Sequence, residues 1–168
     1  MGRMTRRAGP AAPLLKRIIS GFGDNRLRVG FFETQQYDDG TPVAYVAAIH
    51  EFGAPEQGIP PRPFMRPAAE EHKAEWDRAF ADGAAAAARG AITPEQVLEQ
   101  IGLVAAGNVS EAIAAVQGPP LKEATIRDKQ RAYADGTAGG VGNLSKPLVR
   151  TGQLIQSPTY VVDRKGAE

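Results

Sequence analysis

Two long consecutive stretches with apolar residues at helical spacing place the strongest constraint on the fold. The first stretch, a helix expected over about residues 66–89, carries an apolar stripe that begins at Phe64 and repeats every fourth position at Ala68, His72, Trp76, Phe80 and Ala84. Residues 93–117 carry the second, at Val97, Ile101, Val104, Ala105, Val109, Ala112, Ile113 and Val116. Thr93, Pro94 and Gln96 have the pattern of a capping box at a helix start. The sequence therefore predicts two long helices, each with an apolar face.

Shorter elements surround these helices. We expect a helix over residues 11–20 that stops at Gly21, a half-buried strand over 26–33, a short helix over 42–52 capped by Thr41, a weak helix or mobile segment over 124–134, and a closing strand over 159–163. Four prolines in residues 54–63 predict an extended, largely non-helical loop. Four glycines in residues 135–145 predict a mobile loop.

Together these patterns predict an α+β fold, with a small antiparallel sheet packed against long α-helices and with extended proline- and glycine-rich loops. A chain of 168 residues suffices for one domain, which we place at residues 11–163. We expect residues 1–10 to form a disordered basic arm and residues 164–168 a disordered tail.

The composition excludes several kinds of chemistry. The chain has no cysteine, which excludes disulfides, thiolate metal sites and thiol catalysis. Its only two histidines, His50 and His72, cannot supply a site with three imidazole ligands. There is no run of 18 apolar residues that could span a membrane.

Few residues suggest catalysis. His50 with Glu51, and His72 with the preceding Glu70 and Glu71, have the residue types of metal ligands or acid–base groups. A single histidine beside a carboxylate on an amphipathic helix is, however, more often a packed or solvated residue. The hydroxyl residues Ser145, Thr151 and Ser157 lack the neighbouring pattern that would activate a nucleophile. We therefore expect no catalytic residue, no metal and no cofactor.

Charge is distributed unevenly, although the net charge is only +1. Residues 1–32 carry seven basic residues and one acid, whereas residues 33–50 carry three acids and no Lys or Arg. Arginines can displace counterions from phosphates, so Arg3, Arg6 and Arg7 are candidates for contact with nucleic acid. No aromatic residue lies between them to stack on bases, which favours a solvated terminus instead. Both interpretations stay open.

Three parts of the chain resemble a known family. The first reads YVAAIHEFG at residues 45–53 and IPPRPFMRPA at 59–68; the second has PPL at 119–121 before Thr125, Ile126 and Lys129; the third reads KPLVRTGQLIQS at 146–157 before TYVV. In this order they are similar to the neck and tail-completion (head–tail joining, virion morphogenesis) proteins of tailed bacteriophages. The resemblance covers roughly residues 26–163. One departure is Arg150, where members of the family often carry an acid.

The resemblance implies a structural protein of the virion neck, made in the host cytoplasm, that joins the head connector to the tail by assembling in a ring. Its partners would be other copies of itself, portal-side proteins, and the tail tube or tail terminator, with no membrane and with DNA only as channel contents. We expect subunit or partner contacts at Arg62, Phe64, Arg66, Gly139, Gly140 and Arg150. Phe64 has an equally weighted alternative as a core residue at a rigid helix start.

Two other functions stay open. One is a tail terminator or minor tail protein that completes the tail tube. The other belongs to a different class, a small nucleic-acid-binding regulator that uses the arginine-rich N-terminus.

Overall fold

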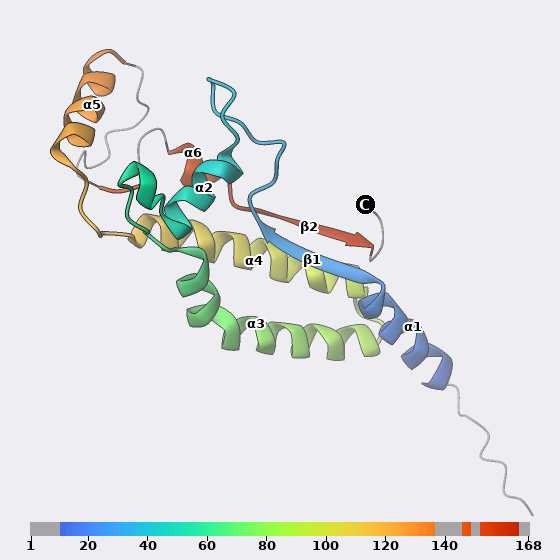
Figure 1. Ribbon diagram of the computed structural model, residues 1–168. Helices are drawn as coiled ribbons and strands as arrows, with labels where there is room; N and C mark the ends of the chain where they lie inside the picture. Colours follow the sequence, from blue (N-terminus) through green and yellow to red (C-terminus); the bar gives the residue numbers. More distant parts are fainter. Residues whose placement is uncertain (1–10, 137–145, 149–151, 165–168) are drawn as a thin grey trace, which may run out of the picture.

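The computed structural model of the chain describes residues 11–136, 146–148 and 152–164. Its helices are α1 (Ala11–Gly23), α2 (Val43–Phe52), α3 (Met65–Ala88), α4 (Pro94–Ala115), α5 (Glu123–Ala134) and the short α6 (Gln153–Gln156), with a 3-10 turn, η1, at Pro55–Gln57 (Figure 1). The strands are β1 (Asn25–Gly30) and β2 (Thr159–Arg164). The expected basic arm, most of the glycine-rich loop and residues 165–168 of the expected C-terminal tail lie outside these residues. Arg164, which the sequence assigns to the disordered tail, instead ends β2, because it pairs with Asn25.

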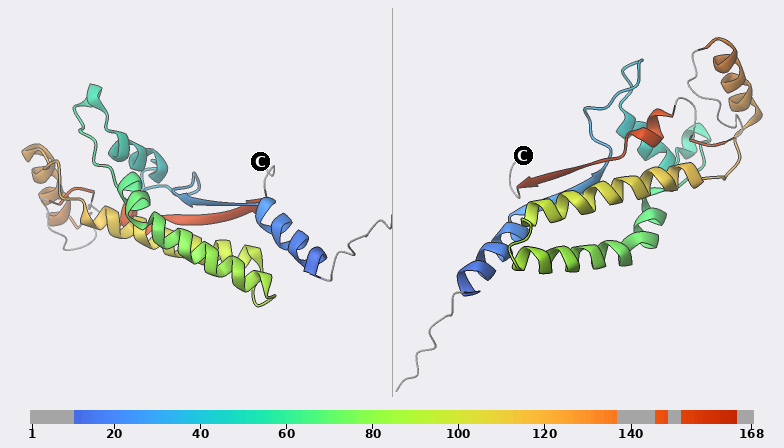
Figure 2. Two further views of the ribbon diagram at one scale, coloured as in Figure 1. Left: turned by 90° about the horizontal axis from the view of Figure 1, so that it is seen from below. Right: turned by 180° about the vertical axis from the view of Figure 1, so that it is seen from behind.

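Helix α4 is the centre of the body. Helix α3 runs along one side of it, and the two strands cross another side (Figures 1 and 2). The strands pair antiparallel, with Asn25 opposite Arg164 and Gly30 opposite Thr159. Arg28 and Asp163 also form an ion pair across the two strands. The predicted α+β fold, with a small antiparallel sheet against long helices, is therefore confirmed.

The predicted start of α4 is also confirmed. The Thr93 hydroxyl accepts a hydrogen bond from the Gln96 backbone N–H at 3.2 Å, and the Gln96 side chain accepts one from the Thr93 N–H at 2.8 Å. This reciprocal pair satisfies two backbone donors that a helix start otherwise leaves free. Within the described ranges, no helix has the length and apolarity needed to cross a bilayer.

Several predicted boundaries are wrong. Helix α1 continues past Gly21 to Gly23, because the Asn25 side chain donates to the Gly21 carbonyl at 2.7 Å and satisfies a free acceptor there. Helix α2 starts after Pro42 with no side-chain cap, because Pro42 and not Thr41 occupies the N-cap position and its side chain has no hydrogen-bonding group. The proline-rich loop is largely non-helical as predicted, with the short 3-10 turn η1 within it. Strand β1 ends at residue 30 rather than 33, and α6 was not predicted.

The stripe predicted on α3 holds only over its first half. Phe64 and Ala68 are buried and Trp76 is half-buried, but Phe80 is 42% exposed and contacts Phe22 edge-on. A four-residue spacing gains about 40° on each step around a helix with 3.6 residues per turn. The buried side therefore passes from Trp76 to Ala87 rather than through Phe80.

The core has two parts, one toward each end of the α3–α4 pair. One contains Ala87, Val97 and Ile101, with Trp76 packed against it. The Trp76 indole N–H also donates to Asn108 on α4 at 2.9 Å. The other joins α2, the start of α3, the last turns of α4 and α6, through Val43, Ala47, Phe64, Ala68, Val109, Ile113, Leu148 and Leu154. This second core carries the candidate site.

We expect replacement of Gly102 by alanine to destabilise the fold, because α4 approaches the strands closely there. A Cβ at Gly102 would lie 2.5 Å from the Tyr160 ring and 2.8 Å from Leu27 Cδ1. Overpacking of this kind lowers the free energy of unfolding by about 1–3 kcal/mol. Urea unfolding of Gly102→Ala measures the loss.

Gly107→Ala is the matched control on the same helix, because a Cβ there meets nothing within 4 Å. It should raise stability by up to about 1 kcal/mol through helix propensity. Equal stabilities for the two variants would contradict the close packing of Tyr160 on α4.

Candidate interaction site

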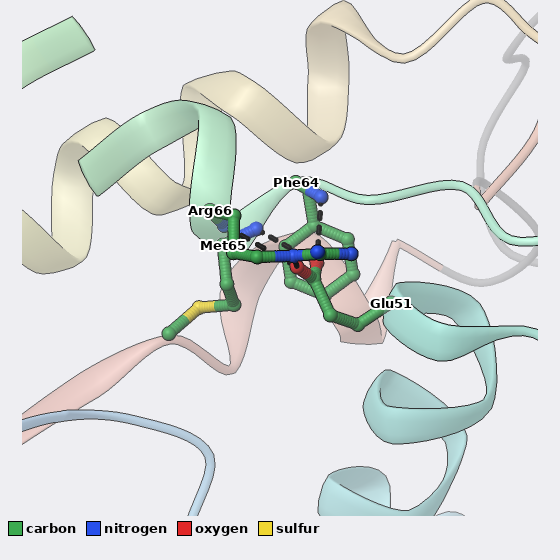
Figure 3. A network of polar contacts seen from close by, with 4 residues as sticks. All are labelled: Glu51, Phe64, Met65 and Arg66. Atoms are coloured by element: carbon green, nitrogen blue, oxygen red, sulfur yellow. Dashed lines mark hydrogen bonds and ion pairs between the residues drawn. The ribbon is translucent and has the colours of Figure 1, made fainter. Parts of the chain in front are cut away.

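Glu51, on the last turn of α2, binds the first turn of α3. Its carboxylate accepts backbone hydrogen bonds from Phe64 at 2.7 Å, Met65 at 2.9 Å and Arg66 at 3.3 Å (Figure 3). The Arg66 Nε donates to the same carboxylate at 3.2 Å. Glu51 is only 4% exposed. We call Glu51 and these donors the Glu51 clamp.

The Glu51 clamp accounts for the free donors at the start of α3. A helix start leaves backbone N–H groups without intrahelical acceptors. Here Phe64 stands at the N-cap and offers no side-chain hydrogen bond. The next residue after Arg66 is Pro67, which has no N–H. Glu51 therefore takes every free N–H from residue 64 to residue 67, and its negative charge lies at the positive end of the helix dipole.

These contacts set the ionisation of Glu51. Burial raises the pKa of this carboxyl, but the hydrogen bonds from Phe64, Met65 and Arg66 favour the charged form more strongly. The pKa of Glu51 consequently lies below its ordinary value. Glu51 is therefore a charged structural acceptor at neutral pH and not a proton donor.

The backbone of residues 53–62 returns the chain to the end of α2. Gly53 has a φ of +78°, and a Cβ there would lie 2.9 Å from the Pro61 nitrogen. The Arg62 N–H then donates to the His50 carbonyl at 2.7 Å. A side chain at residue 53 would oppose both the positive φ and this close return. The glycine thus allows Phe64 to reach Glu51.

Arg62 holds residues 119–120 against the loop of residues 53–62. It is 5% exposed, and its guanidinium donates from Nε to the Pro119 carbonyl at 2.8 Å and from Nη2 to the Pro120 carbonyl at 3.2 Å. Burial lowers the pKa of Arg62. The sequence predicts Arg62 at a contact with a partner, whereas in the structure its guanidinium binds carbonyls of its own chain.

Phe64 is buried, whereas Arg66 is exposed. Phe64 is 1% exposed and packs edge-on against Phe31, with ring centroids 5.9 Å apart. It therefore occupies the position of a core residue, which was the second of its two predicted roles. The Arg66 side chain is 66% exposed. The other predicted contact residues, Gly139, Gly140, Arg150, Arg3, Arg6 and Arg7, lie outside the described residues.

A cleft of about 490 Å³ lies beside the Glu51 clamp, between residues 37–41, α2, α5 and the segment that leads to α6. Apolar side chains form much of its wall, including Val46, Leu121, Leu148 and Leu154. Its polar groups include Tyr37, whose pKa is raised by burial and by Asp39, and Lys129, which donates to the Lys146 carbonyl at 2.7 Å.

His50 also lines this cleft, and its Nδ1 is buried without a hydrogen-bond partner. Burial lowers its pKa to about 4, with the positive charges of Arg62 and Lys129 acting in the same direction. The imidazole is therefore neutral at physiological pH.

The other predicted chemical candidates have structural contacts. His72 Nδ1 lies 3.0 Å from Glu75 on an exposed part of α3, and the Ser157 hydroxyl donates to the Gln153 carbonyl at 2.7 Å. Ser145 and Thr151 lie outside the described residues. In the part of the chain that the structure describes, no three His, Asp or Glu residues gather as metal ligands.

From the sequence, Glu51 is a candidate only for acid–base or metal chemistry, and its role as a helix cap is not predicted. A signal was present, because no Ser, Thr, Asp or Asn precedes α3 to cap it, while Pro67 marks its first turn. The distance of 13 residues between Glu51 and Phe64 hides the cap from local pattern analysis.

Comparison of the chain with protein-family models, with curated proteins and with solved structures gave no match.

We expect Glu51→Ala to lower the free energy of unfolding by about 2–4 kcal/mol, because it leaves several backbone donors without their charged acceptor. Glu51→Gln should cost less, since its amide oxygen still accepts from Phe64 or Met65 while the charge is lost. Chemical unfolding at neutral pH ranks the two variants.

Glu70→Gln is the control, because it removes an exposed carboxylate from the same part of α3. Its stability should lie within about 0.5 kcal/mol of the original. A Glu51→Ala variant as stable as this control would contradict the Glu51 clamp.

Proposed function

We propose that this chain is a structural protein of the neck of a tailed bacteriophage, which joins the head connector to the tail by assembling in a ring. In this proposal it acts through protein–protein contacts and without covalent chemistry, in the host cytoplasm during assembly and then in the virion. The proposal begins from the three sequence segments that resemble neck and tail-completion proteins.

One observation carries the proposal beyond the resemblance: those segments meet at one end of the molecule. Glu51, from the first segment, binds residues 64–66 of the same segment. Arg62 binds the carbonyls of Pro119 and Pro120, which open the second.

The third segment meets the same end of the molecule. Lys129, which closes the second segment, binds the Lys146 carbonyl at the start of the third. Leu148 and Leu154, from the third segment, lie in one core with Phe64. Residues that are far apart in sequence thus build one scaffold.

The chemistry of this scaffold supports an assembly role. Its charged groups at Glu51, Arg62 and Lys129 are buried and bound to backbone groups, so they hold segments of the chain together. Exposed aromatic and aliphatic side chains lie instead on the surfaces of α2 and α4, at Tyr45, Phe52, Leu103 and Val104. Exposed apolar side chains of this kind are typical of contact surfaces.

Electron microscopy of lysates from a phage with a nonsense mutation in this gene tests the proposal. We expect DNA-filled heads beside separate, complete tails, because a missing joining protein blocks only their union. Supply of the intact chain from a plasmid should restore infectious particles and serves as the control.

Other outcomes would contradict the joining role. Filled heads with missing tails or tails of abnormal length would indicate a tail terminator or minor tail protein. Normal infectious particles would contradict both virion roles. Salt-dependent binding of DNA by the purified chain would then favour the nucleic-acid-binding regulator.

A further inference from the structure

Helix α2 is apolar on its outer side as well as on its inner side. Val43 and Ala47 face inward and are buried. Tyr45 and Phe52 face outward and are 56% and 69% exposed, with exposed Ala48 between them. A helix that is apolar all round is typically covered on both sides.

The cation Arg66 lies at the edge of this outer side. The Arg66 guanidinium carbon lies 6.0 Å from the centre of the Phe52 ring, and the Arg66 side chain is 66% exposed. The one acid of α2, Glu51, is buried on the inner side, where its carboxylate accepts from the Nε of Arg66 at 3.2 Å and leaves the rest of the Arg66 guanidinium exposed. We call Tyr45, Ala48, Phe52 and Arg66 the aromatic face.

Helix α4 has an outer side of opposite charge. All its charged residues are acids, at Glu95, Glu99 and Glu111, and all three are exposed. Leu103 is 66% exposed and Val104 is 46% exposed, within two turns of Glu99 and Glu111. We call Glu99, Leu103, Val104 and Glu111 the acidic face.

The acidic face lies away from the packed sides of α4. Val97 meets Gly83 of α3, and Gly102 meets Tyr160 of β2, so those two sides of the helix are already covered. The exposed residues Leu103 and Val104 lie on the remaining side.

The two faces belong to opposite sides of the molecule. In Figure 2, α2 and η1 project on one side of the strands, and α4 lies on the other. One chain therefore cannot bring its own aromatic face to its own acidic face.

We propose that the aromatic face of one copy binds the acidic face of a second copy. Phe52 and Tyr45 would pack on Leu103 and Val104, and Arg66 would meet the carboxylates of Glu99 or Glu111. A contact between two different faces repeats from copy to copy and builds a closed ring or an open filament. This inference rests on the proposed function, since ring assembly supplies the second copy.

Two variants of the full chain test this contact. Phe52→Asp damages only the aromatic face, and Leu103→Asp damages only the acidic face. Both positions are exposed, so the fold should survive, and circular dichroism checks this. Sedimentation velocity over a range of concentrations measures association.

The intact chain should self-associate, and each variant alone should associate about thirtyfold or more weakly, as for loss of an interface hot spot. An equimolar mixture of the two variants should form a one-to-one dimer and nothing larger. In that dimer the intact acidic face of Phe52→Asp binds the intact aromatic face of Leu103→Asp. The two damaged faces cannot pair, because both then carry added negative charge.

Tyr133→Asp is the control, because it places the same charge at a 46% exposed aromatic residue on α5, outside both faces. It should associate like the intact chain. An intact chain that stays monomeric up to its solubility limit would overturn the contact.

Two further results would also overturn it. One is association of Leu103→Asp as strong as that of the intact chain. That result would mean that two aromatic faces bind each other and that the acidic face takes no part. The other is an equimolar mixture of Phe52→Asp and Leu103→Asp that stays monomeric.

Electron microscopy of the mutant-phage lysates tests the proposed function separately. Separate heads and tails, with association unaffected by Phe52→Asp, would overturn this contact and leave the joining role. The expected association pattern, with normal infectious particles from the mutant phage, would support the contact and overturn only the joining role.

Discussion

The hydrogen bonds between the Glu51 carboxylate and the first turn of α3 determine much of the structure. A buried charge is costly unless it is paired and hydrogen-bonded, and Glu51 meets both conditions through residues 64–66. The bond fixes the end of α2 to the start of α3. It thereby places Phe64 in the core beside Val109 and Ile113, and it holds the outer side of α2 toward solvent.

The long helices and the two individual strands could be predicted from the sequence, because they depend on local periodicity and caps, whereas the pairing of β1 with β2 joins opposite ends of the chain. The capping box at Thr93 and the alternation in β1 and β2 are contained within a few residues. The candidate site could not be predicted in the same way. Glu51 meets Phe64 across a proline-rich return, and Arg62 reaches Pro119 across 57 residues, so neither partner is visible in a local pattern. For the same reason the sequence assigned Arg62 to a surface that it does not occupy.

The loop of residues 53–62 explains in physical terms why the first segment that resembles phage neck proteins contains glycine and several prolines. The glycine after Phe52 permits the sharp reversal, the prolines stiffen the return, and Pro67 removes a donor that Glu51 could not reach. These features stiffen the connection between α2 and α3. A rigid α2 suits our proposal of assembly between copies, since a preorganised face loses less conformational entropy on binding.

Titration of the Glu51 side chain, followed by the NMR signal of its carboxyl carbon, tests the Glu51 clamp most directly. A carboxylate that accepts several N–H hydrogen bonds must be harder to protonate than a free one. We predict a midpoint below the ordinary value of 4.5, despite burial. A midpoint at or above 4.5 would mean that burial dominates and that the hydrogen bonds to α3 do not hold in solution.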